Sequence, residues 1–243
     1  MRTWTVPGYT EVRSAEVATV DGCLVVATHD GTGVRVTIRY LAKERQGDEG
    51  WLARYRHKAR RLADLDSPYV VGIYEYVEAA DGAATVEQYV DGVGLTPLLA
   101  SGRLGPEPVL TVLKGVLLGL VAADAVGASG GFVASEVLID RAGHVKLAGG
   151  FGTDTTTDEA VRSLADAAAA AFVAVRAFLP DRLPKPLRQL GSLSAGDVDA
   201  LLAGLDAAAV AAWGSGWEAT GRQQLARAVA RVAGRPAPGR ENG

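Results

Sequence analysis

The chain is poor in cysteine and histidine, and each shortage excludes a class of chemistry. Its 243 residues include one cysteine and three histidines. One cysteine cannot form a disulfide within the chain, which fits a reducing compartment. Cys23 lies in the apolar run 23–27, and this position predicts burial as a small hydrophobic side chain. His29, His57 and His144 fall in separate predicted segments. No histidine cluster therefore supports metal or catalytic-triad chemistry.

The chain also lacks a surplus of positive charge and a long hydrophobic run. It carries 25 Lys and Arg against 28 Asp and Glu, so its composition does not support nucleic-acid binding. Its first residues lack the apolar core of a signal peptide. The two longest apolar runs are too short to span a bilayer, because Lys114 and Asp124 bracket one and Asp166 and Arg176 bracket the other. We therefore expect a soluble cytoplasmic protein with no membrane span.

Apolar residues make up 48% of the chain, which is enough for one large domain or two small lobes that share a cleft. Short apolar runs alternate with turn signals from residue 9 to 39 and predict three antiparallel strands. Apolar residues at helical spacing between 48 and 65 predict an amphipathic helix with a basic exposed face. Apolar runs at 70–77 and 84–89 surround an Asp-Gly pair and predict a hairpin.

Beyond residue 90 the pattern becomes mostly helical. A short helix at 97–100 and a long buried helix from 106 to about 127 come first. Two apolar runs, 137–139 and 145–148, flank Asp140-Arg141-Ala142-Gly143 and predict a second hairpin. Three further helices are predicted: 158–177, behind a capping box formed by Thr156 and Glu159, 194–213, and 217–232.

Four stretches and their order resemble the eukaryotic-like Ser/Thr protein kinases of bacteria. They are VPGYTEV, RYRHKARRLADLDSPYVVGIYEY, EQYVDGVGLTPLL and EVLIDRAGHVKLAGGFG. The resemblance implies an α+β, protein-kinase-like bilobal fold. It implies an N-lobe at 1–90 with five antiparallel strands and one helix, and a reduced, mainly helical C-lobe at 91–234 without an activation segment. Residues 235–243 are predicted to be a disordered tail.

Three N-lobe positions of the resemblance depart from an active kinase. The glycine-rich loop that covers ATP phosphates falls on residues 17–22, where only Gly22 of its glycines remains. Arg39 stands where a lysine holds the α- and β-phosphates, and Lys58 stands where a glutamate pairs with that lysine. Two cations about 4 Å apart repel by about 4 kcal/mol at an effective dielectric of about 20, so Arg39 and Lys58 should point apart or share an anion.

The second hairpin has the layout of a kinase catalytic centre without its acids. In the resemblance Glu136 replaces the metal-binding asparagine, Val133 the catalytic-loop lysine, and Gly131 or Phe132 the base aspartate. Gly150-Phe151-Gly152 stands in the place of Asp-Phe-Gly, so Gly150 replaces the metal-holding aspartate. We therefore predict no catalytic residue and no metal site.

The segment after the hairpin is short. Only residues 153–157 lie between the Gly-Phe-Gly triplet and the next predicted helix, where kinases place an activation segment. In that helix Ala160 replaces the aspartate that braces the catalytic loop. A peptide substrate would lack its docking platform.

Together these departures predict a pseudokinase that serves as a protein-binding scaffold or allosteric regulator, without a cofactor and with ATP binding unfavourable. Its partner would be an unidentified protein, and the basic face of the 48–65 helix is one candidate surface. A first alternative is a nucleotide or anion sensor, in which Arg39 and Lys58 grip phosphate without metal and residues from Glu87 to Tyr89 line an adenine site. A second alternative is an atypical phosphotransferase with one of three acids as replacement base: Glu136, Asp154 or Asp158.

Overall fold

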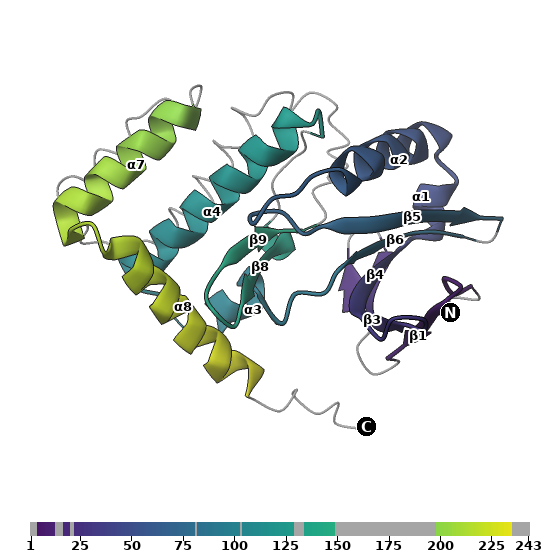
Figure 1. The fold of residues 1–243 in the computed structure, drawn as a ribbon, viewed down its shortest axis with the longest axis horizontal. Coiled ribbons are helices and arrows are strands. Elements are labelled where there is room, and N and C mark those ends of the chain that lie inside the picture. The colour runs from purple at the N-terminus through teal and green to yellow at the C-terminus, as the bar shows by residue number, and fades with distance from the viewer. Residues whose placement is uncertain are drawn as a thin grey trace.

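The chain forms two groups of elements, a large antiparallel sheet with its helix and a mainly helical group (Figure 1). The computed structural model describes the following residues: 4–12, 17–19, 22–80, 82–102, 104–128, 134–148 and 198–234. In Figure 1 the large sheet and its helix lie on the right, the helices of the second group lie on the left, and a small sheet lies between them. The predicted α+β, bilobal architecture is confirmed.

Six strands form the larger sheet: β1 (Tyr9–Glu11), β2 (Val17–Thr19), β3 (Gly22–His29), β4 (Arg35–Leu41), β5 (Ile73–Ala79) and β6 (Gly82–Gln88). The order is β1-β3-β4-β6-β5, with β2 also paired to β3, and all pairs are antiparallel. Successive side chains of a strand point to opposite faces of the sheet. On one face Val25, Ile38 and Val86 are buried in an aliphatic core.

The prediction of five strands in the N-lobe is wrong by one strand. Where the sequence predicts a single first strand, the structure has β1 and β2 on the same neighbour, β3. Their registers differ, because Tyr9 lies opposite His29 whereas Val17 lies opposite Leu24. One regular strand cannot hold both registers, since a change of register requires additional residues that leave the ladder.

Two helices follow β4, where the sequence predicts one. The helix α1 (Lys43–Gln46) is a single turn, and α2 (Glu49–Ala63) is the predicted amphipathic helix. The side chain of Asp48 accepts a hydrogen bond from the backbone N–H of Trp51 at 2.9 Å and so caps α2. Four side chains at helical spacing form the buried stripe of α2: Trp51, Tyr55, Ala59 and Leu62.

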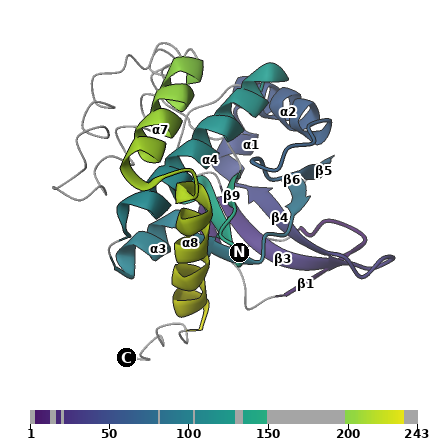
Figure 2. The same cartoon turned by 60° about the vertical axis from the view of Figure 1, so that its left-hand side comes forward.

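The second group is built around α4 (Pro106–Ala125), the predicted long helix. Around it lie α3 (Leu95–Ala100), α7 (Val198–Trp213) and α8 (Trp217–Ala233). Figure 2 shows α4 beside α7 and α8, and Leu113 and Leu117 of α4 are fully buried in their common core. By length and composition α4 could cross a membrane, as could α7 and α8 taken as one pair bent by 87°, but 67% of the apolar window of α4 is buried inside the fold.

A small sheet connects the helical group to the larger sheet. Its order is β7-β8-β9, with β7 at Gly92–Gly94, β8 at Val137–Asp140 and β9 at Val145–Leu147. The predicted hairpin of β8 and β9 is confirmed, with Val137 opposite Leu147. Its turn is held by the Asp140 carboxylate, which accepts hydrogen bonds from the backbone N–H groups of Ala142 and His144 at 2.9 and 2.8 Å.

The two groups are joined by backbone hydrogen bonds at Leu147. Its N–H donates to the carbonyl of Tyr69 at 2.8 Å, and its carbonyl accepts from the N–H of Val71 at 2.9 Å. Leu147 pairs with Val137 at the start of β8, so this contact also positions Glu136, which directly precedes β8. The predicted capping box at Thr156 and Glu159, the 158–177 helix and the 235–243 tail lie outside the described residues.

Candidate functional site

Arg39 belongs to a buried ion pair on the larger sheet. It lies on β4 with 5% of its surface exposed, and Glu87 lies on β6 with 2% exposed. The Nε of Arg39 donates to Oε1 of Glu87 at 2.7 Å, and its Nη2 donates to Oε2 at 3.4 Å. Thr85 is the residue directly opposite Arg39 in the β4–β6 ladder, so Glu87 is its diagonal neighbour on the same face. Strand pairing alone therefore brings the two charges together.

A second carboxylate approaches Arg39 from the other group of elements. Glu136 ends the short 3-10 helix η2 (Ala134–Glu136), directly before β8. Its Oε1 lies 3.9 Å from Nη1 of Arg39. This distance gives an ion pair but is too long for a hydrogen bond. Arg39 thus links the larger sheet to the segment that leads into the β8–β9 hairpin.

Two hydroxyl groups extend the cluster to α2. Thr85 is fully buried, and its hydroxyl donates to Oε1 of Glu87 at 2.9 Å. The Tyr55 hydroxyl lies 3.1 Å from Oγ1 of Thr85. Because the single hydroxyl proton of Thr85 goes to Glu87, Tyr55 is the donor in this second bond. The chain of hydrogen bonds from Tyr55 through Thr85 and Glu87 to Arg39 ties α2, β6 and β4 together.

Burial and charge act in opposite directions on the groups of this cluster. Burial alone would lower the pKa of Arg39, but the charge and hydrogen bonds of Glu87 more than offset it, so the pKa lies above its ordinary value. Burial raises the pKa of Tyr55, although the charge of Arg39 opposes this rise. Arg39 is therefore charged, Tyr55 is neutral, and the guanidinium faces two carboxylates.

The structure does not bring Arg39 and Lys58 together into one anion-binding pair. Lys58 lies on α2 and is half-buried; its pKa is lowered by burial and then by the charge of Arg54. The charges that act on Arg39 come from Glu87, Tyr55 and Glu136. The charge that acts on Lys58 is therefore that of Arg54.

Gly22 serves the packing of strands. It lies opposite Leu41 in the β3–β4 ladder and has a φ of +148°, a conformation that side chains disfavour. A Cβ atom at this position would collide with the carbonyl oxygen of Tyr40. The close approach of two strands thus accounts for this glycine. Val20 and Asp21, which precede it, lie outside the described residues.

Glu87 and Tyr89, which were predicted to line an adenine site, lie in different environments. Glu87 points to Arg39, whereas Tyr89 is half-buried and its ring centre lies 4.7 Å from the guanidinium carbon of Arg35, a cation–π contact. Gly131, Phe132, Val133 and Gly150-Phe151-Gly152 lie outside the described residues, as do Asp154, Asp158 and Ala160. Within the described ranges, no group of three or more His, Cys, Asp or Glu side chains is placed to hold a metal ion.

The role of Glu87 as partner of Arg39 is the functional feature that sequence reasoning missed. A signal for it exists in β6, where Thr85 and Glu87 alternate with apolar residues in a strand that is otherwise buried. Two polar side chains at this spacing lie on the same face of a strand and require a polar partner when buried. Arg39 is the cation of the neighbouring strand that meets this requirement.

Comparisons with known proteins give serine/threonine-protein kinases of bacteria as relatives. A probable serine/threonine-protein kinase of Streptomyces coelicolor is 31% identical over 121 residues, which cover 47% of this chain and 18% of that protein. The serine/threonine-protein kinase PknL of Mycobacterium tuberculosis is 34% identical over 115 residues, which cover 46% of this chain and 29% of PknL. The chain thus matches less than a third of the length of either relative. No model of a protein family matches it.

A solved structure matches nearly the whole chain. The kinase domain of PknI from Mycobacterium tuberculosis superposes with a TM-score of 0.65 at 20% identity, over 96% of this chain and 99% of that domain. At this identity the match establishes the fold alone.

Proposed function

We propose that this chain, which has the fold of the eukaryotic-like Ser/Thr protein kinases of bacteria, is a catalytically inactive homologue that acts as a protein-binding scaffold or allosteric regulator. The observation that carries this proposal is the engagement of Arg39 by Glu87 and Glu136. In the resemblance, Arg39 occupies the position that holds the phosphates of ATP. Here its guanidinium stays charged and is paired with two carboxylates, that of Glu87 on the neighbouring strand and that of Glu136 directly before β8.

Electrostatics oppose phosphate binding at this position. A phosphate that reached Arg39 would lie close to two carboxylates, and two unit charges about 5 Å apart repel by about 3 kcal/mol at an effective dielectric of about 20. The same argument weighs against the sensor alternative, which needs Arg39 and Lys58 to share an anion.

The substitutions at catalytic positions support the proposal independently. Phosphoryl transfer depends on positioning and charge stabilisation, and the loss of one stabilising donor in an enzyme costs about a hundred- to a thousandfold in rate. The sequence replaces the base, the metal-holding aspartate and the pairing glutamate together. A kinase homologue without these groups retains a folded surface for binding other proteins.

The names of the relatives favour a competing function, that of an active protein kinase, and one assay decides between the two. Purified chain is incubated with labelled ATP and either Mg2+ or Mn2+, with a generic protein substrate, beside the Arg39→Ala variant. We expect label incorporation at background level for both proteins. Transfer by the unmodified chain that disappears in Arg39→Ala would establish a kinase and overturn the proposal.

Nucleotide binding without catalysis is tested by thermal unfolding. A ligand at about 100 times its dissociation constant adds about 2.7 kcal/mol of stability. We expect no rise in melting temperature with ATP, ADP or GTP, with or without Mg2+. A rise that the Arg39→Ala variant loses would favour the sensor alternative.

The binding role is tested in the native host. Tagged chain is purified from a cytoplasmic extract, and a protein partner is expected to copurify in a constant ratio. An untagged chain supplied in excess should displace that partner. Recovery of the tagged chain alone would contradict a scaffold role.

A further inference from the structure

A groove of about 460 Å3 lies at the junction of three elements: the end of α2, the start of β5 and β9. This volume is within the range of about 300–1,000 Å3 that is common for ligand sites. One end of the groove is formed by the segment after α2 with Asp66 and Pro68, and the other by Ile73 and Tyr74. Gln88 and Lys146 complete the wall. Gln88 follows Glu87 on β6, so its side chain is turned away from the Arg39 cluster.

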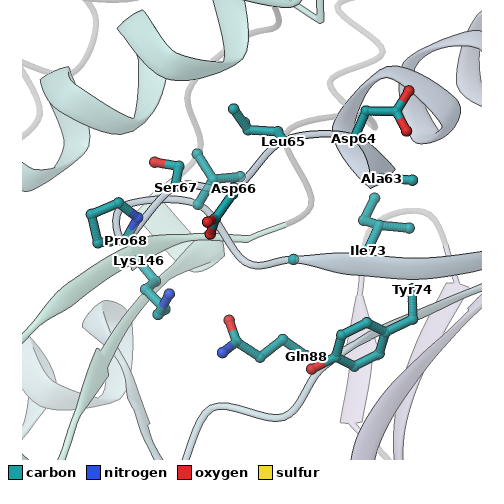
Figure 3. A pocket seen from close by; sticks show the side chains of 12 residues that line it. Ala63, Asp64, Leu65, Asp66, Ser67, Pro68, Ile73, Tyr74, Gln88 and Lys146 are labelled. Atoms are coloured by element: carbon teal, nitrogen blue, oxygen red, sulfur yellow. The ribbon is translucent and has the colours of Figure 1, made fainter.

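Polar side chains surround the groove. Figure 3 shows the carboxylate of Asp66, the ammonium of Lys146 and the amide of Gln88 around the same space, with the ring of Tyr74 beside Gln88. Among the residues that the structure describes, the side chains of these four make no hydrogen bond or ion pair with one another or with a neighbour. Gln88 and Lys146 are half-buried, whereas Asp66 and Tyr74 are exposed. A ligand that supplies hydrogen-bond partners to the half-buried amide and ammonium groups would stabilise them.

The charges of the groove favour a dipolar ligand. Lys146 is half-buried, and burial lowers its pKa although Asp140 and Asp66 act in the opposite direction. Asp66 and Lys146 attract each other across the groove without forming a salt bridge within 4.0 Å. A phosphate between them would be repelled by Asp66, and an isolated cation would be repelled by Lys146. A group that is negative at one end and positive at the other satisfies both.

We propose that this groove binds a short, extended peptide segment of a partner protein. A peptide carbonyl accepts from Lys146 and from the amide of Gln88, and a peptide N–H donates to Asp66. The exposed ring of Tyr74, at 57% exposure, and the side chain of Ile73 offer apolar contact for one side chain of the peptide. The inference rests on the proposed scaffold role and names the surface that performs it.

The test uses peptides of defined length because the partner is unidentified. Random seven-residue peptides displayed on phage are selected on the intact chain, and the enriched sequence is synthesised with blocked ends and a fluorescent label. Its affinity is then measured by fluorescence polarisation. We expect Lys146→Met and Asp66→Asn each to weaken binding about tenfold or more, since a hydrogen bond to a charged group contributes about 1.5–3 kcal/mol. Lys43→Met, which removes an exposed lysine on α1, should change affinity less than about twofold.

Several results would overturn the groove as a peptide site. Selection that enriches no peptide is one, and a peptide that binds Lys146→Met as tightly as the unmodified chain is another. If either charge variant fails to fold, as judged by circular dichroism, Gln88→Ala removes a second contact without changing charge and should still weaken binding.

The two proposals fail in different ways. A copurified host protein that Lys146→Met retains would remove the groove and leave the scaffold role intact. Phosphate transfer in the kinase assay would remove the scaffold proposal, whereas peptide binding that depends on Lys146 would still establish the groove.

Discussion

At the scale of single residues, Arg39 and Glu87 form a buried ion pair between β4 and β6. A buried ion pair adds little stability compared with apolar residues of the same size, because both charges lose their hydration. Its loss is nevertheless costly when only one partner is removed, since the other charge then stays buried and unpaired. The pair is therefore a structural constraint on β4 and β6.

Replacement of Glu87 by glutamine tests this constraint. The amide would keep the shape of the side chain, and among the described residues the Arg39 charge would keep the carboxylate of Glu136 at 3.9 Å. We expect Glu87→Gln to lower the free energy of unfolding by about 3 kcal/mol, measured by urea denaturation. The matched control is Glu78→Gln in the exposed pair with Arg56, which should cost less than about 1 kcal/mol. Equal losses in the two variants would contradict a buried pair.

The raised pKa of Tyr55 predicts that the free energy of unfolding depends on pH in the alkaline range. Burial raises its pKa above the ordinary value of 10.0, so the folded chain keeps a proton that the unfolded chain releases. The stabilisation is complete below the unfolded pKa and is lost as the pH rises through the folded pKa. Between pH of about 9 and 11 we expect the free energy of unfolding to fall more steeply for the unmodified chain than for Tyr55→Phe. Parallel profiles from denaturation at each pH would rule out this contribution.

Sequence reasoning identified the unusual residues but not their partners. Arg39 stands out because a motif fixes its place, and the prediction that Lys58 would not pair with it follows from charge alone. Glu87 could not be assigned to Arg39 in the same way, since this requires the register between β4 and β6, strands that α2 and β5 separate along the chain. A pairing register is set by the whole sheet.

At the scale of elements, glycine determines how closely α4 approaches β9. Gly115 lies inside the helix, and a Cβ atom there would be 2.7 Å from Cβ of Val145. Alanine is the better helix former by about 1 kcal/mol, but overpacking a core costs about 1–3 kcal/mol. The second effect dominates, because Val145 belongs to a strand that cannot retreat without breaking its hydrogen bonds to β8.

We therefore expect Gly115→Ala to lower the free energy of unfolding by about 1 kcal/mol or more. Gly50→Ala is the control, because Gly50 lies in the exposed first turn of α2 and its added Cβ would meet no atom closer than 3.5 Å. That change should be neutral or stabilise by up to about 1 kcal/mol. Chemical denaturation of both variants gives the comparison, and a stabilised Gly115→Ala would refute the close packing.

Helices and hairpins were predictable because their signals are local. The apolar spacing of α2 and α4 and the turn residues of the β8–β9 hairpin lie within a few positions of one another. By contrast, β7 has three residues, two of them glycine, and its partner β8 lies far along the chain. Such a short strand shows no alternation of apolar and polar residues, so its sequence alone does not predict it. The boundaries predicted at residues 90 and 234 stay predictions.

At the scale of the whole molecule, several contacts couple the two lobes within the described residues. A hydrophobic cluster joins α2 and Val70 to Ala123 near the end of α4. The backbone bonds of Leu147 with Tyr69 and Val71 also cross between the lobes, and the ion pair of Arg39 with Glu136 adds a further link. Gly119 of α4 lies against the backbone contact of Leu147 with Tyr69, since a Cβ atom there would be 2.9 Å from the carbonyl oxygen of Tyr69. A chain joined in this way should unfold as one cooperative unit.

Replacement of Gly119 by valine should weaken the coupling between the two lobes during unfolding. The larger side chain would displace the segment at Tyr69 and weaken its bonds to Leu147, whereas the same replacement at Gly115 acts on Val145 within the helical group. For the unmodified chain and for Gly115→Val, we expect the urea transitions followed by tryptophan fluorescence and by far-ultraviolet circular dichroism to coincide. For Gly119→Val we expect them to diverge, because the larger sheet then unfolds at a lower urea concentration than the helices. Coincident transitions in Gly119→Val would show that coupling between the lobes does not depend on this contact.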